Sequence, residues 1–482
     1  MMRTVLAHTL ALFLSVFVAD ASAADKPSRP NILVIFADDL GWKGVGFDGD
    51  TRYETPHLDA LAKQAMVFPM AYASSGNCAP SRACLWSGEY TPRHEVYAVH
   101  ATDRGPKNLM RLIPIPNKVE LAPEKITIAE SLRAAGYRTG LFGKWHVGEQ
   151  APYRPTDQGF DVYVGTYKRT SDVTEDPKSM FSLSQAALKF IEEDRTRPFF
   201  AFIAHHAIHT PLAATAASVR HFEEKSPGLN HQDILYAAST LDLDNSVGLV
   251  MARLRELGLE ENTLVIFTSD NGGTQQSSQE PLRGNKGCYY EGGIRVPFFA
   301  RWPGRIAPGI NATPVTNIDF YPTFLSLANA PAPKDYPLDG ANLMPLFTGK
   351  VTGLDRAIFW HFPGYLDTPV IRGRDPVFRT RPVTVVRQGD WKLHLYHEEW
   401  FLDGGRQKLA SNHAVELYNL ASDPGERHDL ANVETTRRDA LLDTLLKWGK
   451  DTGAKFAHEP NPAYNPNSPV KGTRGKNAAK GG

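Results

Sequence analysis

Four runs of apolar, often β-branched residues stand out along the chain, and each gives way abruptly to polar side chains. The runs cover residues 31–37, 137–142, 199–204 and 264–268. A continuous apolar run of this length is typical of a strand that is buried on both faces, as in a parallel sheet. Between the runs, residues 127–135 and 182–193 space their apolar positions three and four apart, which predicts helices. The alternation predicts an α/β fold with a large, mostly parallel mixed sheet flanked by helices.

Ionisable and amide side chains follow all four apolar runs. In open α/β sheets, ligands bind beyond the carboxyl ends of the strands, so these side chains are expected to gather in one site. Ordinary loop polarity explains any one such ending, but four similar endings favour a shared site. The residues concerned are Asp38, Asp39, Lys144, His146, His209, Asp270 and Asn271.

The hydrophobic pattern of the sequence changes after about residue 350. Short strands with partial alternation are predicted at residues 382–386, 391–396 and 416–420. With a helical pattern at residues 435–448, they indicate a small α+β subdomain with an antiparallel sheet. We therefore expect a main domain over residues 24–350 and the subdomain over residues 351–459. Residues 460–482 have almost no apolar content, which predicts a disordered tail.

The N-terminus has the three parts of a signal peptide. Arg3 provides a positive charge, an apolar stretch extends to Val18, and Ala21-Ser22-Ala23 is a cleavage site of small residues. The apolar stretch is too short to span a membrane comfortably, and no later run reaches that length. Residues 1–23 are therefore interpreted as a signal peptide. The mature protein is expected to be secreted or periplasmic, without stable insertion into a membrane.

Composition narrows the function further. Lysine and arginine together number 53, as do aspartate and glutamate, so the formal net charge is zero. This balance argues against a nucleic-acid binder held mainly by counterion release, but it leaves room for a local basic pocket that binds a small anion. The three cysteines, Cys78, Cys84 and Cys288, are too few for a disulfide scaffold and odd in number. One thiol must stay free, react or be modified.

Residues 78–88, CAPSRACLWSG, hold the strongest chemical signal in the sequence. Pro80 suits the first turn of a helix, which places Cys78 at the helix N-terminus. That position favours an anion and is expected to lower the pKa of the thiol. Arg82 lies one turn further and can reach back toward the same end. Cys78 is thus a candidate nucleophile, although a buried structural cysteine is the commoner case.

This segment resembles the signature of the type I sulfatases, which belong to the alkaline-phosphatase-like superfamily. The signature reads C-x-P-S-R, then a small hydroxyl residue and glycine; Ser87 stands here where threonine is commoner. In that family a maturation enzyme oxidises the cysteine to formylglycine (3-oxoalanine), and the hydrated aldehyde supplies the attacking oxygen. The resemblance implies that Cys78 is modified in this way, that a formylglycine-generating enzyme is a partner, and that residues 24–350 form a catalytic sulfatase domain.

The resemblance also implies a metal ion. Asp38-Asp39 and Asp270-Asn271 are similar to the family's two pairs of calcium ligands, and such oxygens suit a hard cation. Alone, Asp38-Asp39 is better explained as a polar loop or a helix cap; the second pair, at another strand end, favours the metal. The implied ligands of one Ca²⁺ are Asp38, Asp39, Cys78, Asp270 and Asn271.

Two basic elements of the family are matched as well. Residues 143–148 resemble its G-K-W-H-x-G element, which implies that Lys144 binds a sulfate oxygen and that His146 orients or deprotonates the hydrate. Residues 282–287 resemble the element in which Lys286 contacts sulfate. Without that motif, Lys286 would be read as an ordinary surface lysine.

His209 matches the family's histidine near the ester oxygen, a candidate general acid. His205 and His206 have no such match and are expected to pack or to cap. Cys84 shares the expected helix of Cys78, and Cys288 follows Lys286 by two residues. In the resembled family Cys78 and Lys286 converge on one sulfate, so Cys84 and Cys288 would lie near each other. Whether these two cysteines form a disulfide is left open by the sequence.

The implied reaction is the hydrolysis of sulfate esters, and the expected substrate is a sulfated carbohydrate or polysaccharide. Export, the aromatic residues at 360–365 and a long connection at residues 101–120 favour carbohydrate, although core packing explains the aromatic residues equally well. One alternative is a phosphonate monoester or phosphodiester hydrolase of the same superfamily. The other is a non-catalytic glycan-binding protein, which the filled catalytic positions disfavour.

Overall fold

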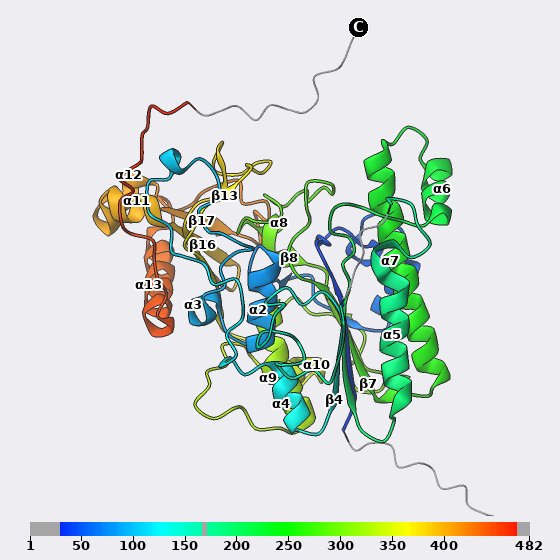
Figure 1. Ribbon diagram of the computed structural model, residues 1–482. Helices are drawn as coiled ribbons and strands as arrows, with labels where there is room; N and C mark the ends of the chain where they lie inside the picture. The colour runs from blue at the N-terminus through cyan, green and yellow to red at the C-terminus, as the bar shows by residue number, and fades with distance from the viewer. Residues whose placement is uncertain (1–28, 166–170, 470–482) are drawn as a thin grey trace, which may run out of the picture.

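The computed structural model describes residues 29–165 and 171–469 (Figure 1). The expected signal peptide, residues 1–23, lies outside the described residues, as do residues 470–482 of the expected tail. Within the described chain, a large sheet carries helices on both faces, and a smaller sheet stands beside it. None of the described helices has the length and apolar character that a membrane span requires.

The large sheet is mixed, and its centre is parallel. Its eight strands lie in the order β10-β2-β9-β7-β1-β6-β4-β5. The central strands are β1 (Asn31–Ala37), β4 (Arg138–Gly143), β6 (Phe199–Ala204) and β7 (Thr263–Ser269). β1 pairs in parallel with β6 and β7, and β6 with β4. The four expected strands are therefore confirmed, as is the α/β fold.

The remaining strands are short and extend the two edges. β5 (Val162–Val164) is parallel to β4, whereas β9 (Phe299–Arg301) is antiparallel to β7. β2 (Met66–Val67) pairs antiparallel with β9 and parallel with β10 (Gly309–Ile310). A separate three-stranded sheet has the order β11-β3-β8, with β3 (Ala71–Tyr72), β8 (Arg295–Val296) and β11 (Val315–Thr316).

Each face of the large sheet has its own apolar core, and β1 contributes alternate residues to both. Ile32, Val34 and Phe36 belong to one core, whereas Leu33 and Ile35 belong to the other. The helices on the first face are α2 (Cys78–Ser87), α4 (Ile128–Ala134), α9 (Phe320–Ala328) and α10 (Met344–Phe347). Those on the second are α1 (Pro56–Ala62), α5 (Met180–Glu193), α6 (Ala216–Lys225) and α7 (His231–Glu256) (Figure 1). Burial on both faces explains why the central strands are apolar throughout.

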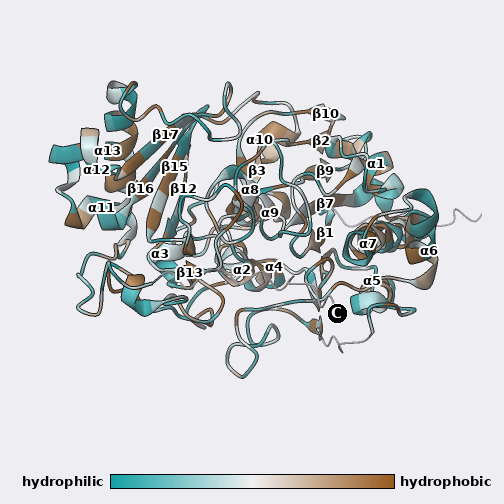
Figure 2. Ribbon diagram, turned by 90° about the horizontal axis from the view of Figure 1, so that it is seen from above, coloured by the Kyte–Doolittle hydropathy of each residue, from teal (hydrophilic) through white to brown (hydrophobic). Residues whose placement is uncertain are grey.

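The C-terminal subdomain is an antiparallel sheet in the order β12-β15-β16-β17. Its strands are β12 (Ala357–Phe362), β15 (Val383–Gln388), β16 (Trp391–Tyr396) and β17 (Val415–Asn419). Helix α13 (Thr435–Thr452) packs against this sheet through Leu441, Leu442 and Leu445. Figure 2 shows the subdomain at the opposite end of the molecule from α6 and α7. The α+β subdomain expected from the sequence is present.

The aromatic residues at 360–365 belong to the core. Trp360, Phe362 and Tyr365 are at most 1% exposed, and Trp360 Nε1 donates a hydrogen bond to the carbonyl oxygen of Ala73 at 2.8 Å. Strand β12 therefore joins the subdomain to the main domain. Of the two explanations of this segment, packing is correct and a substrate-binding role is not.

The expected tail needs a correction at its start. Pro460 forms a β-bridge with Leu112, and the backbone of Asn461 donates to the carbonyl oxygen of Arg111 at 2.9 Å. Asn465 donates in the same way to Asn108 at 2.8 Å. Residues 460–469 thus form an arm along the 101–120 connection. Polar and backbone hydrogen bonds hold this arm, so its low apolar content gave no sign of it.

A buried charged cluster fastens the subdomain to the segment that carries Lys286. Lys392 Nζ lies 2.9 Å from Glu291 Oε1 and 2.9 Å from Glu426 Oε1, and all three side chains are at most 1% exposed. Burial raises the pKa of Glu426, and Lys392 opposes that shift. The two carboxylates therefore share one buried lysine as an ion-pair partner.

Replacement of Lys392 by alanine is expected to lower the free energy of unfolding by about 3 kcal/mol, because it removes the lysine that bridges two buried carboxylates. Urea unfolding followed by circular dichroism measures this change. Lys447→Ala is the matched control, since it removes an exposed lysine that pairs with Asp451, and it is expected to have little effect. Equal unfolding midpoints for the two variants would contradict the proposed importance of the cluster.

Candidate active site

The polar residues that follow the central strands meet the N-terminus of α2 in one cavity. The cavity has a volume of about 470 Å³ and is lined by the expected residues Asp38, Cys78, Lys144, His146, His209 and Lys286. The parallel strands end at the same edge of the sheet, which is why residues far apart in sequence converge there. The structure therefore brings these six residues together around one cavity.

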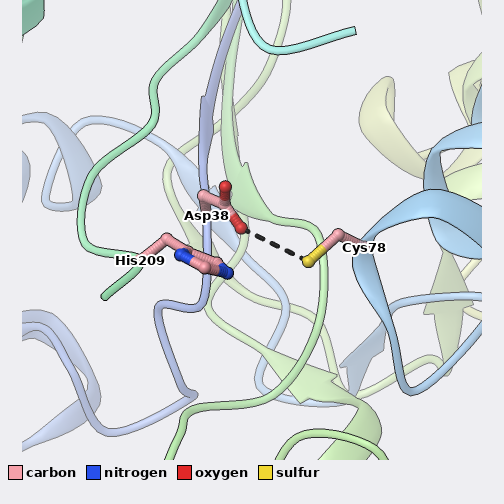
Figure 3. A group of neighbouring side chains, drawn as sticks. All are labelled: Asp38, Cys78 and His209. Carbon is pink, nitrogen blue, oxygen red and sulfur yellow. Dashed lines mark hydrogen bonds between the residues drawn. The ribbon is translucent and has the colours of Figure 1, made fainter. Parts of the chain in front are cut away.

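Cys78 is the first residue of α2 and is 1% exposed. Its Sγ lies 3.0 Å from Lys286 Nζ, 3.5 Å from Asp38 Oδ1 and 3.8 Å from Asp39 Oδ1. Figure 3 shows Asp38, Cys78 and His209 directed toward one another from three different elements. The side chain of residue 78 is therefore at the centre of the cluster.

The expected lowering of the Cys78 pKa is wrong. Burial raises the pKa of this thiol strongly, and the positive charges of Lys144 and Lys286 do not outweigh it. The nearby carboxylates of Asp270 and Asp38 raise it further. Desolvation dominates because the thiol has almost no contact with water. An unmodified Cys78 is thus a neutral thiol at physiological pH.

Lys144 and Lys286, whose positive charges act on Cys78, each have a carboxylate partner. Lys144 Nζ lies 2.5 Å from Asp38 Oδ2, and Lys286 Nζ lies 2.5 Å from Asp39 Oδ1. Burial by itself raises the pKa of Asp38, but Lys144 and other cations outweigh it and hold that pKa well below its usual value. Asp38 is therefore ionised.

Arg82 is fully buried and joins two strand ends. Its Nε and Nη2 donate to Asp270 Oδ2 at 3.0 and 2.8 Å, and its Nη1 donates to the carbonyl oxygen of Lys144 at 2.6 Å. Gly143 precedes Lys144 with φ +115°, and a Cβ there would collide with the carbonyl oxygen of Ala204. A glycine is therefore required for the turn that presents Lys144 to the cavity.

Four side chains form a group suited to a cation. Ligand atoms of Asp38, Asp39, Cys78 and Asp270 all lie within 4.8 Å of one another. Asn271 Nδ2 donates to Asp39 Oδ1 at 2.8 Å, whereas the buried Asn271 Oδ1 has no hydrogen-bond partner among the described residues. Burial and the charge of Asp38 raise the pKa of Asp270 to about 6. A hard cation would satisfy the unpaired oxygen and offset the repulsion between carboxylates, so these residues fit the expected calcium site.

Two histidines of the expected site also line the cavity. Burial and the charge of Lys144 lower the pKa of His146 to about 2, so its imidazole is neutral. His209 Nδ1 donates to the carbonyl oxygen of Thr210 at 2.5 Å, and its Nε2 lies 3.8 Å from Asp39 Oδ2. The hydrogen bond from Nδ1 orients the ring and leaves Nε2 for the cavity.

The cavity is also lined by residues that were not predicted from the sequence, namely Asn77, Val99, His100, Arg104, Lys178, His206, Thr210 and Arg379. The position of His206 differs most clearly from the prediction, because this residue was expected only to pack or to cap. His205 is 1% exposed and packs as expected. Arg104 lies in a loop and Arg379 lies on a short strand, and no sequence motif marks either residue.

The possible disulfide does not form, because all three cysteines are free thiols. Cys84 lies six residues after Cys78, which places it on a different side of α2. There it joins the core of the C-terminal subdomain, and its Sγ lies 3.3 Å from His94 Nε2. Cys288 packs in another cluster, with Tyr290 and Leu420.

Comparison with known proteins decides the family. Residues 30–330 match the family model described as Sulfatase. This chain belongs to the sulfatase family. Residues 284–447 of this sulfatase also match the model described as N-sulphoglucosamine sulphohydrolase, C-terminal. The resemblance found in the sequence is thereby confirmed, and the protein is a sulfuric ester hydrolase.

Relatives of this sulfatase align over most of its length. N-acetylgalactosamine-6-sulfatase of Mus musculus is 31% identical, over 88% of this chain and 86% of that protein. Arylsulfatase A of Homo sapiens is 32% identical, over 86% of each chain. The crystal structure of Ps i-CgsB in complex with k-i-k-neocarrahexaose matches with a TM-score of 0.71 at 26% identity, over 89% of this chain and 95% of that one.

Proposed function

We propose that this sulfatase hydrolyses sulfate esters of a carbohydrate, with a hydrated formylglycine made from Cys78 as the nucleophile and with one Ca²⁺. The observation that carries the proposal is the convergence on Cys78 Sγ of Lys286, at 3.0 Å, and of the carboxylates of Asp38 and Asp39. A separate maturation enzyme would oxidise the thiol to the aldehyde and supply the oxidant. The hydrate offers an attacking oxygen and, in its second hydroxyl, a route for the release of sulfate.

The chain's own residues divide the remaining work. Lys144 and Lys286 are placed to hold the sulfate oxygens by charge, with Arg82 behind them. Neutral His146, which lines the same cavity, is proposed to orient residue 78 or to accept its proton. His209, at the more exposed wall, is placed to donate a proton to the ester oxygen as the S–O bond breaks. A calcium ion held by Asp38, Asp39, residue 78, Asp270 and Asn271 would add fixed positive charge beside the sulfate.

Two observations support a carbohydrate as the alcohol part of the ester. The named relatives include an N-acetylgalactosamine-6-sulfatase and a protein solved with a neocarrahexaose. A second cavity of about 730 Å³ is lined by the 101–120 connection and by Asn461 of the C-terminal arm. This cavity shares His100 with the active-site cavity. An oligosaccharide attached to the sulfated sugar has room to extend there.

The proposed reaction is tested by a panel of defined sulfated oligosaccharides, with Cys78→Ala as the inactive control. Aryl sulfate, aryl phosphate diester and aryl phosphonate monoester are assayed in parallel. We expect turnover of sulfate esters and a kcat/KM for aryl sulfate above that for the phosphorus substrates. A preference for a phosphorus ester would favour the phosphonate or phosphodiester hydrolase. Binding of glycan without any turnover would favour the glycan-binding alternative.

His209→Ala is expected to lower kcat about 100-fold on an alkyl or sugar sulfate, because the alkoxide then leaves without a proton. The loss is expected to be much smaller on nitrophenyl sulfate, since nitrophenolate needs no proton to leave. Steady-state kinetics on both substrates measure the difference. His221→Ala, at an exposed histidine that pairs with Glu54, is the control. An equal loss on both substrates would exclude His209 as the general acid.

Export is the remaining part of the proposal. Residues 1–23 are proposed to be removed as the chain reaches the periplasm or the exterior. N-terminal sequencing of the protein from its own host is expected to begin after Ala23, and an N-terminus that retains the apolar stretch would contradict this.

A further inference from the structure

One arginine in the active-site cavity differs from its neighbours in lacking a counter-charge. Three other cations have carboxylate partners at 2.5, 2.5 and 2.8 Å, in the pairs Lys144–Asp38, Lys286–Asp39 and Arg104–Asp367. Arg379 also lines the cavity, but within the described chain it has no carboxylate at ion-pair distance. A guanidinium is charged at any physiological pH, and the carboxylates of Asp367 and Asp39 act on this charge only from beyond ion-pair distance.

Neutral groups fix Arg379 in place. It lies on β14 (Phe378–Thr380), which pairs with β13 (Leu366–Asp367). Its Nη1 donates to the carbonyl oxygen of Lys286 at 3.1 Å, and its Nε donates to that of Thr368 at 3.3 Å. Gly287 has φ +92°, and a Cβ there would collide with Cδ of Arg379. The guanidinium is thus preorganised, while its Nη2 has no hydrogen-bond partner among the described residues.

The surroundings of Arg379 favour an incoming anion. Burial, together with the positive charge of Arg104, lowers the pKa of Arg379, and these effects outweigh the opposite effect of Asp367 and Asp39. An anion would relieve both effects, and an arginine with free donors binds planar or tetrahedral oxyanions well. Arg379 also lines an adjoining cavity of about 250 Å³, which shares His209 and Lys286 with the first. There is therefore space beside the reacting sulfate for another substituent.

We propose that Arg379, with Arg104 beside it, forms a second anion-binding subsite for a negatively charged group of the substrate other than the sulfate that is hydrolysed. That group is a second sulfate or a carboxylate on the same or the neighbouring sugar. The inference rests on the proposed function, because it assigns the cavity to a sulfated carbohydrate. It makes this enzyme selective for polyanionic glycans over singly sulfated ones.

A purely positioning role is the competing explanation, since Arg379 contacts the carbonyl oxygen of Lys286. A positioning role would lower kcat on every sulfate ester by the same factor. A subsite instead changes the ratio of kcat/KM between substrates with and without the second anion, mainly through KM. The ratio therefore separates the two explanations.

The experiment measures wild type, Arg379→Gln and Arg379→Lys on three kinds of probe. These are monosulfated galactose and glucosamine, their disulfated counterparts, and the monosulfated sugars linked to a uronate. We expect Arg379→Gln to lower the ratio of disulfated to monosulfated kcat/KM between 10- and 100-fold, in line with a lost charge-assisted hydrogen bond. Arg379→Lys is expected to retain part of the ratio. The disulfated and uronate probes show which anion the subsite takes.

Arg305→Gln is the matched control, because Arg305 is exposed beyond β9 and carries the same charge. It is expected to leave the ratio as in wild type. An unchanged ratio in Arg379→Gln, or equal losses on all probes, would overturn the subsite.

Calorimetry in the Cys78→Ala background separates this inference from the proposed function. We expect the disulfated probe to bind more tightly than the monosulfated one, and Arg379→Gln to remove that difference. If the unmutated enzyme hydrolyses none of the probes but this binding difference is found, the proposed function fails and the subsite stands. If sulfate esters are hydrolysed without any effect of the second anion, the subsite fails and the function stands.

Discussion

Replacement of Cys78 by alanine is expected to lower kcat/KM for sulfate esters by a factor of about 10⁴ or more, since it removes the side chain from which the proposed nucleophile is made. The fold is expected to persist, because Cys78 contributes only one small side chain at the first position of α2. Circular dichroism and the thermal unfolding midpoint check the fold, and turnover of aryl sulfate checks the activity.

Cys78→Ser sharpens this test. A serine has one hydroxyl, so it can accept the sulfuryl group but cannot expel sulfate by re-forming a carbonyl. We expect a single slow turnover, after which the protein is heavier by one SO₃ group in intact mass spectrometry. Cys84→Ala is the control on the same helix, because its thiol lies in the core of the subdomain. That variant is expected to remain active.

The state of residue 78 is measured directly on the active enzyme. Residue 78 itself is expected to lack sulfur, and the peptide that contains it is expected to react with a hydrazide reagent for aldehydes. Protein produced without the maturation enzyme is expected to keep the thiol and to be inactive, in agreement with its raised pKa. Full activity of a preparation in which residue 78 is an intact cysteine would contradict the mechanism.

The strands could be predicted because one physical cause governs them. A strand buried on both faces is apolar at every position, and β1 divides its residues between two cores. Helix α7 gave no comparable signal. Its residues 234–240 are all buried, so no single apolar stripe marks the helix. Strand β12 was not predicted either, because its aromatic residues are equally typical of a buried strand and of a binding surface.

The site could be predicted where polar residues follow the central strands, and it was missed where no pattern leads to it. Arg379 lies on a strand of three residues and reaches the cavity only because Gly287 leaves space for its side chain. The sequence also placed Cys78 correctly at a helix N-terminus but gave the wrong direction for its pKa. Position along a helix can be inferred from sequence, whereas desolvation depends on the packing of distant segments.

Removal of divalent cations with EGTA is expected to abolish turnover and to lower the thermal unfolding midpoint of this enzyme. Without a cation, the carboxylates of Asp38, Asp39 and Asp270 remain close together in a buried site. A ligand present at about 1,000 times its Kd stabilises the folded state by about 4 kcal/mol. Added Ca²⁺ is expected to restore both properties, and Mg²⁺ to restore them poorly, because Mg²⁺ requires a smaller and more regular set of ligands.

Asn271→Ala tests the same site without a change in charge. It removes the buried Oδ1 that has no partner within the described chain, and with it one expected ligand of the cation. We expect the loss of this ligand to weaken Ca²⁺ binding by at least about 1.4 kcal/mol, which corresponds to a factor of ten in affinity. The rise in the unfolding midpoint then requires at least a 10-fold higher Ca²⁺ concentration. Asn31→Ala is the control, because Asn31 is a buried amide at the other end of β1 that bonds Thr263 and Phe199. It is expected to lower stability while the Ca²⁺ response is kept. If EGTA leaves turnover and the unfolding midpoint unchanged, or if both asparagine variants respond alike to Ca²⁺, the cation does not bind where the unpaired oxygen and the three carboxylates place it.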